Sequence, residues 1–420
     1  MFRLIQALNY RCLRYVSQPL RPFQVLVGPN ASGKTTFLDV PSFLGDIIQN
    51  GLEYAITTRT KDFRDLLWQR QLNSSPLELA VEAIIPDERL KLLESNDTSY
   101  DTVRFEIRIG FDENGDVPQI LSEKVLLKTW QEPQRPIPTL FPGPVKPPET
   151  ILSSRSRPGY RTVVSKKHKG NDNFSPEVKA KGDWVPAFTF GPFKSALANL
   201  PEDESRFPVS VWLKRLLSDS VQSVVLDSLL MREASPPGQV RRFRTDGGNL
   251  PWVIAELQKS ESRFNDWIRH LRTALPDIES IRTIEREDDR HRYLVVKYTG
   301  GLEVPSWTLS DGTLRLLALT LLAYLPELRG VYLIEEPENG IHPQAVETLF
   351  QSLSSVYESQ ILLASHSPVI LNAAEPEQVL CFKKASDGAV DIVEGNRHPA
   401  LRSWKRETSL GVLFAAGVLG

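Results

Sequence analysis

The residues with the clearest chemical meaning lie near the N-terminus. The segment from Gly28 to Thr35 reads G-x-x-x-x-G-K-T and directly follows the apolar run at 23–27. A strand, a glycine-containing loop and a helix in this order are typical of a phosphate-binding loop, whose backbone N–H groups hold phosphate oxygens. Lys34 would reach the β- and γ-phosphates, and the Thr35 hydroxyl would hold Mg²⁺. The spacing therefore predicts a nucleoside triphosphate site, although a glycine-rich turn with a chance Gly-Lys-Thr would read the same.

Two adjacent carboxylates end an apolar run far downstream. The run at 331–334 is followed by Glu335 and Glu336. Open α/β sheets bind ligands at the C-terminal ends of their strands, which would place both acids beside the phosphate loop. Glu335 could hold Mg²⁺ directly or through water, and Glu336 could polarise a water for attack on the γ-phosphate. Taken alone, the pair could equally be a solvated strand end.

Two further segments carry polar groups where they could meet phosphate. Ser310 and Gly312 open an apolar helical stretch, which is a second candidate anion site. The apolar run at 360–364 ends near His366, whose ring could reach a γ-phosphate. Taken alone, His366 could also be an ordinary strand-end histidine.

The order of these motifs resembles the ATP-binding-cassette ATPase heads, and within them the AAA_21 and AAA_15 group of RecF/SMC-like and OLD-like ATPases. The segment 309–313 resembles the cassette signature, 333–343 the Walker B and D-loop segment, and 365–368 the His switch. The opening segment 8–13 is similar to the turn with which such heads begin. This resemblance implies an α/β fold of the P-loop NTPase type, with a mixed sheet flanked by helices, an added antiparallel β lobe and a helical insertion.

The resemblance also implies roles for individual residues. ATP and Mg²⁺ would be the ligands, with Thr35 and Glu335 at the metal, and Lys34, Glu336 and His366 in catalysis. In such families two heads sandwich two ATP molecules, so Ser310 and Gly312 would contact the γ-phosphate bound by the other subunit. The remaining nucleotide contacts would come from Arg11, Gly28, Pro29, Asn30, Ala31, Ser32, Gly33 and Thr36.

The biological role follows from the resemblance alone. Relatives built this way commonly act in anti-phage defence with a separately encoded effector, often a nuclease, and the 54 or so residues after His366 are too few for a C-terminal Toprim nuclease domain. A DNA-repair or chromosome-maintenance head without an effector is a second reading. A transporter cassette is a third, which the Glu-Glu-Pro-Glu form of the Walker B segment disfavours.

Composition and length limit the architecture. The chain has 420 residues, 41% hydrophobic and 24% charged, with 50 Lys and Arg against 52 Asp and Glu. Such a chain is longer than one core usually grows, and its near-zero net charge confines any contact with DNA to a local patch. Two cysteines, the lack of a long apolar run and an N-terminus that reads as a strand predict a cytoplasmic protein with no membrane segment. We divide it into 1–130 and 301–420 as two ATPase lobes, a Pro-rich and basic insertion at 131–185, and a helical and β insertion at 186–300.

The insertion at 131–185 joins a proline-rich stretch to a basic one. Seven prolines between 133 and 148 favour extended polyproline conformation. A basic and partly aromatic loop follows, which could grip a phosphate backbone, or could be a solvated loop. Its candidate DNA contacts are Arg155, Arg157, Arg161, Lys166, Lys167 and Lys169. A second basic group at 241–244 would extend this surface only if the fold brings the two together.

Several elements can be predicted from periodicity and composition. The segments 79–83, 103–109 and 292–298 read as strands, the first two in an antiparallel sheet, and 264–275 reads as a helix with one buried face. The segment 378–382 should complete the ATPase sheet. Pro41 predicts that the helix after the phosphate loop is kinked or ends near Val40. The tail from 410 reads as a helix docked on the core, or as a partner-docking surface.

Overall fold

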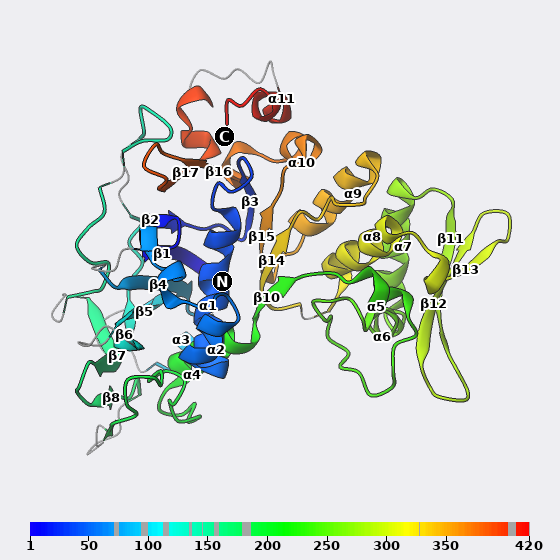
Figure 1. Cartoon of the computed structure of the whole chain (residues 1–420). Helices are drawn as coiled ribbons and strands as arrows, with labels where there is room; N and C mark the ends of the chain where they lie inside the picture. Colours follow the sequence, from blue (N-terminus) through cyan, green and yellow to red (C-terminus); the bar gives the residue numbers. More distant parts are fainter. Residues whose placement is uncertain are drawn as a thin grey trace.

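The computed structural model describes residues 1–70, 75–93, 100–111, 117–133, 137–144, 146–154, 159–178, 186–326, 328–401 and 409–419. Figure 1 shows a central sheet with an antiparallel sheet on one side and a helical part with a small third sheet on the other.

The central sheet has six strands in the order β10-β14-β15-β3-β16-β17. Neighbours from β10 to β16 are parallel, and only β17 runs antiparallel. Their bounds are Val221–Val224 (β10), Gly330–Glu335 (β14), Ser359–Ala364 (β15), Phe23–Val27 (β3), Val379–Lys384 (β16) and Val390–Glu394 (β17). The strand order brings 23–27, 330–335 and 359–364 together, although more than 300 residues separate the first two along the chain.

This sheet is buried on both faces, which explains the nearly continuous apolar runs of its strands. Leu26 and Leu362 contribute to one core, together with side chains of the antiparallel sheet and the first helix. Their neighbours Val25 and Leu363 contribute to a second core on the opposite face. The alternation follows from the two-residue period of a strand.

The antiparallel sheet has eight strands in the order β2-β1-β4-β5-β6-β7-β8-β9. Their bounds are Leu13–Pro19 (β2), Phe2–Tyr10 (β1), Leu77–Ile84 (β4), Thr102–Phe111 (β5), Pro118–Lys128 (β6), Tyr160–Lys167 (β7), Asp172–Phe174 (β8) and Ala187–Phe188 (β9). The two strands predicted at 79–83 and 103–109 are confirmed as β4 and β5, which pair antiparallel. The basic stretch predicted as a loop is in part the strand β7.

The third sheet and the helices α5 to α9 form the opposite part of the molecule (Figure 1). The sheet comprises Ile278–Glu285 (β11), Arg292–Tyr298 (β12) and Glu303–Pro305 (β13). The helices of this part and of the C-terminal segment are Ser228–Arg232 (α5), Leu250–Leu257 (α6), Glu261–Ala274 (α7), Asp311–Leu321 (α8), Pro343–Ser354 (α9), Pro368–Ala373 (α10) and Leu410–Ala415 (α11). The predicted apolar face of α7 is confirmed, since Trp267, Ile268 and Leu271 are buried.

The helix after the phosphate loop, α1 (Lys34–Asn50), contains Pro41 and continues well beyond it. The alternative that it ends near Val40 is therefore wrong. Proline removes one backbone hydrogen bond, but Phe37, Phe43 and Ile47 on the same helix are buried in the core. Tertiary packing of this face outweighs the local loss. The other helices near α1 are Leu52–Thr57 (α2), Asp87–Leu90 (α3) and Pro208–Asp219 (α4).

The strand expected at 378–382 is confirmed as β16, which pairs with β3. In the tail, α11 lies against α10, and Leu410 is buried. The four-part division of the chain stays a prediction, although β10, from the part at 186–300, is an edge strand of the central sheet.

Candidate nucleotide site

The candidate site lies where three neighbouring parallel strands end. β14, β15 and β3 are adjacent, so their C-terminal ends meet at one edge of the sheet. The phosphate loop follows β3. Glu335 is the last residue of β14 and Glu336 follows it, and His366 lies two residues after β15. The structure therefore brings together the predicted residues Lys34, Glu336 and His366.

The phosphate loop is held tightly against the sheet. Gly33 precedes α1 with φ of 100°, and a Cβ atom at this position would lie 2.6 Å from Cγ2 of Val390. Only glycine combines this left-handed backbone with so close an approach. Nζ of Lys34 donates to the carbonyl oxygens of Gly28 (2.8 Å) and Pro29 (3.0 Å), so the ammonium lies across the loop.

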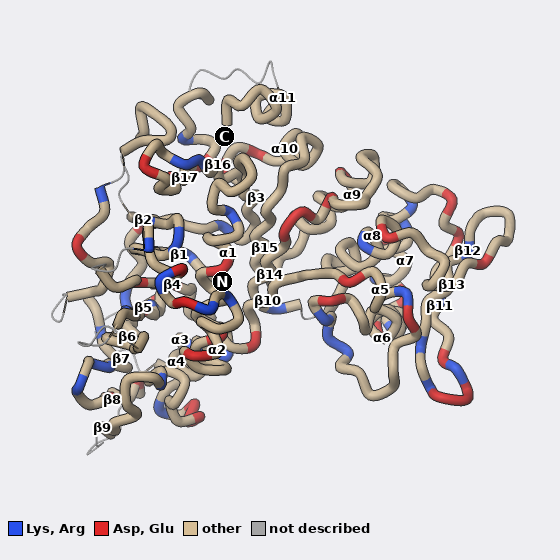
Figure 2. Tube along the Cα trace, in the orientation of Figure 1, with Lys and Arg blue, Asp and Glu red and all other residues tan. Residues whose placement is uncertain are grey.

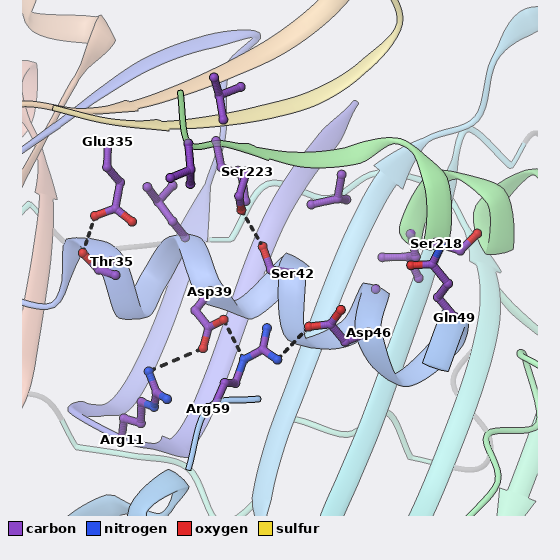
Figure 3. A pocket seen from close by; sticks show the side chains of 17 residues that line it. Arg11, Thr35, Asp39, Ser42, Asp46, Gln49, Arg59, Ser218, Ser223 and Glu335 are labelled. Atoms are coloured by element: carbon purple, nitrogen blue, oxygen red, sulfur yellow. Dashed lines mark hydrogen bonds and ion pairs between the residues drawn. The ribbon is translucent and has the colours of Figure 1, made fainter. Parts of the chain in front are cut away.

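Thr35 and Glu335 form the candidate magnesium site. The Thr35 hydroxyl donates directly to Oε2 of Glu335, as the close-up in Figure 3 shows. Hydroxyl and carboxylate oxygens are the protein ligands that Mg²⁺ prefers, with phosphates and water completing its shell. Both side chains are exposed at the sheet edge. The pair fits the role that the sequence predicts for it.

Glu336 and His366 face each other across this edge. Nε2 of His366 lies 4.0 Å from Oε1 of Glu336, and the other carboxylate oxygen accepts from Nδ2 of Asn339 at 2.6 Å. The backbone of Glu336 has φ of 46°, a left-handed conformation that is uncommon for a non-glycine residue. Its N–H donates to the carbonyl oxygen of Ala364 at 2.8 Å, which ties it to β15. Strained conformations of this kind cluster at functional sites.

The charges of the site influence one another. Burial lowers the pKa of Lys34, and the carboxylates Glu336 and Glu335 partly oppose this shift. Burial and the nearby Lys34 ammonium lower the pKa of His366, against the raising effect of Glu336 and Glu338. His366 is thus biased towards the neutral imidazole, which can both donate and accept a hydrogen bond.

The predicted signature segment lies at the start of α8. Ser310 is exposed, and its hydroxyl accepts from the N–H of Thr313 at 3.1 Å as the helix N-cap. Close packing requires glycine at position 312, because a Cβ atom there would lie 2.1 Å from the carbonyl oxygen of Gly340. The signature segment therefore touches the loop that follows Glu336 in the same chain.

Sequence reasoning missed Arg232, which holds the signature segment from α5. Its guanidinium donates to the carbonyl oxygen of Leu309 at 3.0 and 3.2 Å and forms an ion pair with Asp311. Ser306 in turn donates to the carbonyl oxygen of Arg232 at 3.0 Å. No motif surrounds Arg232, so its role depends on a contact across about 77 residues of sequence that only the fold reveals.

Arg11 lines a cleft beside α1. The cleft has a volume of about 460 Å³, and its lining includes Thr35 of α1, residues of the end of α4 and of β10, and Glu335 (Figure 3). Nη1 of Arg11 lies 3.6 Å from Oδ2 of Asp39, and Arg59 bridges Asp39 and Asp46. The predicted nucleotide contact Arg11 thus has a carboxylate neighbour within the same cleft as the metal ligands.

The basic residues predicted to contact DNA differ in their exposure and contacts. Lys166 is 3% exposed, and its ammonium pairs with Asp172 at 2.9 Å, so the prediction is wrong for this residue. Position 166 is buried on β7, whereas the next position, 167, is exposed, as expected for neighbours on a strand. Arg161 is half-buried and donates to the carbonyl oxygen of Pro176, whereas Lys167 and Lys169 are exposed. Arg155 and Arg157 lie outside the described residues.

The second basic group does not extend this surface. Figures 1 and 2 place β7 at one end of the molecule and the segment before α6 at the other. Arg241 pairs with Glu256 at 3.0 Å, and Arg244 pairs with Asp246. Figure 2 shows Lys and Arg interspersed with Asp and Glu over most of the chain.

None of the helices in the described ranges has the length and apolar character that crossing a bilayer requires.

Heads of SMC proteins are among the solved structures that this chain matches. The crystal structure of the SmcHead bound to the C-winged helix domain of ScpA matches with a TM-score of 0.53 and 14% identity, over 93% of this chain and 97% of that one. The Smc head with an extended coiled coil, bound to the C-terminal domain of ScpA and derived from Pyrococcus furiosus, gives 0.49 and 12% identity, over 100% and 98%. The first of these likenesses shows that this chain shares the fold of an SMC head.

Sequence comparisons give the family. An OLD nuclease of Thermus scotoductus is 44% identical over 48 residues, which are 11% of this chain and 9% of that protein. The model of the AAA_21 family, described as "AAA domain, putative AbiEii toxin, Type IV TA system", matches residues 23–372. That span runs from the first residue of β3 into α10 and includes the phosphate loop, the signature segment, both carboxylates and His366. The chain belongs to the AAA_21 family of ATPases.

Proposed function

We propose that this protein binds Mg·ATP at the edge formed by β3, β14 and β15 and hydrolyses it. The observation that carries the proposal is the convergence of Lys34, Thr35, Glu335, Glu336 and His366 from three separate parts of the chain. Each of these residue types matches one need of phosphoryl transfer, namely charge neutralisation, metal binding and water activation.

Each of these residues has a separate role in the proposed reaction. The loop N–H groups and the Lys34 ammonium bind the phosphates, and Thr35 and Glu335 hold Mg²⁺, which when bound neutralises charge on the β- and γ-phosphates. Glu336 accepts the proton of the attacking water, and the largely neutral His366 hydrogen-bonds to the γ-phosphate or the water. Lys34 is already surrounded by backbone acceptors, so its ammonium enters the reaction partly desolvated.

The same proposal includes a dimer closed by ATP. Ser310 is exposed at a helix N-terminus, where the N–H groups of α8 favour an anion. Arg232 holds both neighbours of Ser310, through the carbonyl oxygen of Leu309 and the side-chain carboxylate of Asp311. We propose that Ser310 of one copy approaches the γ-phosphate held by Lys34 of another, so that binding and hydrolysis of ATP close and open the dimer.

The biological output that we propose is a DNA-related defence switch acting with a separately encoded effector. The family description names a toxin of a toxin–antitoxin system, and one partial relative is a nuclease. The second candidate is a chromosome-maintenance head without an effector, which the likeness to SMC heads favours. Copurification of a second protein with this chain supports the defence switch that acts with an effector. DNA binding by the chain in the absence of any other protein supports the chromosome-maintenance head.

The hydrolytic function is tested by phosphate release from ATP with the full chain. With Mg²⁺ we expect steady turnover, and with EDTA in excess the rate should fall to that of ATP alone, because Thr35 and Glu335 then have no cation to present to the phosphates. Release that continues unchanged in EDTA, or no release with Mg²⁺, would contradict the proposal.

We predict separately that the two exposed lysines of the β7 region, Lys167 and Lys169, contact DNA. Reversing their charge with Lys167→Glu and Lys169→Glu should weaken DNA binding and reduce the slope of log affinity against log salt by about two, since each lysine neutralises about one phosphate. Titration of duplex DNA at two salt concentrations measures both quantities. The matched control is Lys61→Glu on the loop after α2. Equal affinities and slopes in all three proteins would rule out a DNA contact at these lysines.

A further inference from the structure

Glu338 links the two loops that carry Glu336 and His366. Its Oε1 atom accepts two hydrogen bonds from the segment after β15, one from the Ser365 hydroxyl at 2.7 Å and one from the N–H of His366 at 2.9 Å. Ser365 is fully buried, and its hydroxyl accepts from the N–H of Ser367 at 2.9 Å. One carboxylate oxygen therefore bridges the chain just after β14 to the chain just after β15.

Backbone hydrogen bonds also hold both segments in place. The N–H of Asn339 donates to the carbonyl oxygen of Glu336 at 3.0 Å, and the N–H of Ile341 donates to that of Glu338, also at 3.0 Å. Ser365 is anchored separately, because its N–H donates to the carbonyl oxygen of Leu26 at 3.0 Å. The contacts of the Glu338 side chain therefore add a connection between two segments that each have backbone hydrogen bonds of their own.

The second carboxylate oxygen of Glu338 is in an unfavourable environment. Oε2 of Glu338 is buried and has no hydrogen-bond partner within the described residues. Burying a carboxylate oxygen without a partner is unfavourable, and an apolar residue of similar size would avoid the penalty. The contacts made by the other oxygen must therefore contribute something that packing alone does not supply.

We propose that Glu338 is the positioning residue that sets His366 against Glu336. Glu338 lies two residues after Glu336 in the chain, and its side chain holds the backbone N–H of His366. The 4.0 Å separation between the side chains of Glu336 and His366 therefore depends on Glu338. Glu338 touches neither the phosphate loop nor the metal ligands in the contacts that the structure describes, so it acts through His366 and not on the substrate. This inference rests on the proposed ATPase function.

The test compares Glu338→Ala with Glu338→Gln in the full chain. Alanine removes the acceptor, whereas the glutamine amide keeps an oxygen that can accept from Ser365 and His366. For Glu338→Ala we expect kcat to fall about 10- to 100-fold, as for other small misplacements of catalytic groups, with nucleotide affinity within about twofold of the wild type. Glu338→Gln should retain most of the activity. Glu358→Ala, an exposed carboxylate before β15, is the matched control.

A second readout does not depend on hydrolysis. Amide hydrogen exchange of the peptide containing His366 should accelerate in Glu338→Ala and stay near the wild-type rate in Glu338→Gln, because only alanine frees that N–H. If the wild type hydrolyses ATP and Glu338→Ala matches it in kcat, the positioning role is overturned while the ATPase function stands. If the wild type does not hydrolyse ATP, the proposed function fails and the positioning role fails with it.

Discussion

Replacing Glu336 by glutamine should slow ATP hydrolysis by about 100- to 10,000-fold, the range that a general base contributes. Glutamine keeps the size of the side chain and can still interact with Asn339, but it cannot take a proton from water. The metal ligands Thr35 and Glu335 and the ammonium of Lys34 are unchanged, so ATP should bind with nearly wild-type affinity. Single-turnover phosphate release and a titration with a fluorescent ATP analogue measure the two quantities separately.

The same variant should accumulate the ATP-closed dimer. If hydrolysis opens the dimer, blocking the chemical step leaves the closed state populated, and light scattering should show twice the monomer mass with Mg·ATP and not without it. Glu358→Gln is the matched control, since its carboxylate is exposed and directly precedes β15, at the strand end opposite to His366. Wild-type hydrolysis in Glu336→Gln would remove Glu336 from the role of base.

The second large effect is expected for Ser310→Arg. Ser310 is exposed at the N-cap of α8 and makes none of the described contacts with Lys34, Thr35 or Glu335 of its own chain. Loss of the N-cap should destabilise the protein by only about 1 kcal/mol. Hydrolysis should nevertheless fall by about 100-fold or more, as when a donor to a transition-state oxyanion is removed, because the arginine side chain occupies the space of the neighbouring triphosphate.

Nucleotide affinity separates this explanation from simple damage. An isolated chain of Ser310→Arg should bind ATP as the wild type does, since its own phosphate loop is intact. Ser355→Arg, a serine at the exposed end of α9, is the matched control and should hydrolyse ATP normally. Weak ATP binding by Ser310→Arg would instead indicate that the substitution disturbs the chain's own site.

Much of the site could be predicted because its motifs are local. The phosphate loop needs a strand, two glycines and a helix within about a dozen residues, and the acids Glu335 and Glu336 close one short strand. Parallel strands then meet at one edge, so the convergence of Lys34, Glu336 and His366 followed from general sheet geometry. The antiparallel strands β4 and β5 were equally predictable from their composition and alternation.

Other features depend on contacts that sequence does not display. Lys166 looked like part of a basic loop, but the register of β7 turns it inward towards Asp172. Pro41 predicted a kink or an early end to the helix, and burial of the neighbouring aromatic side chains carries α1 past it. Arg232 and Glu338 act across sequence separations of about 77 and 28 residues, where no spacing rule applies.

The central claim is that each ATP site is completed by a second copy of the chain, and a mixing experiment tests it most directly. Lys34→Ala removes the phosphate-binding ammonium, and Ser310→Arg blocks the signature segment, so each variant alone should be inactive. In a mixed dimer, the intact phosphate loop of one variant meets the intact Ser310 of the other and forms one working site.

Equal amounts of the two variants should therefore recover about a quarter of the wild-type rate, since half of the dimers are mixed and each has one of its two sites intact. Circular dichroism of each variant confirms that both are folded. A mixture that hydrolyses ATP no faster than the sum of the separate variants would contradict the claim.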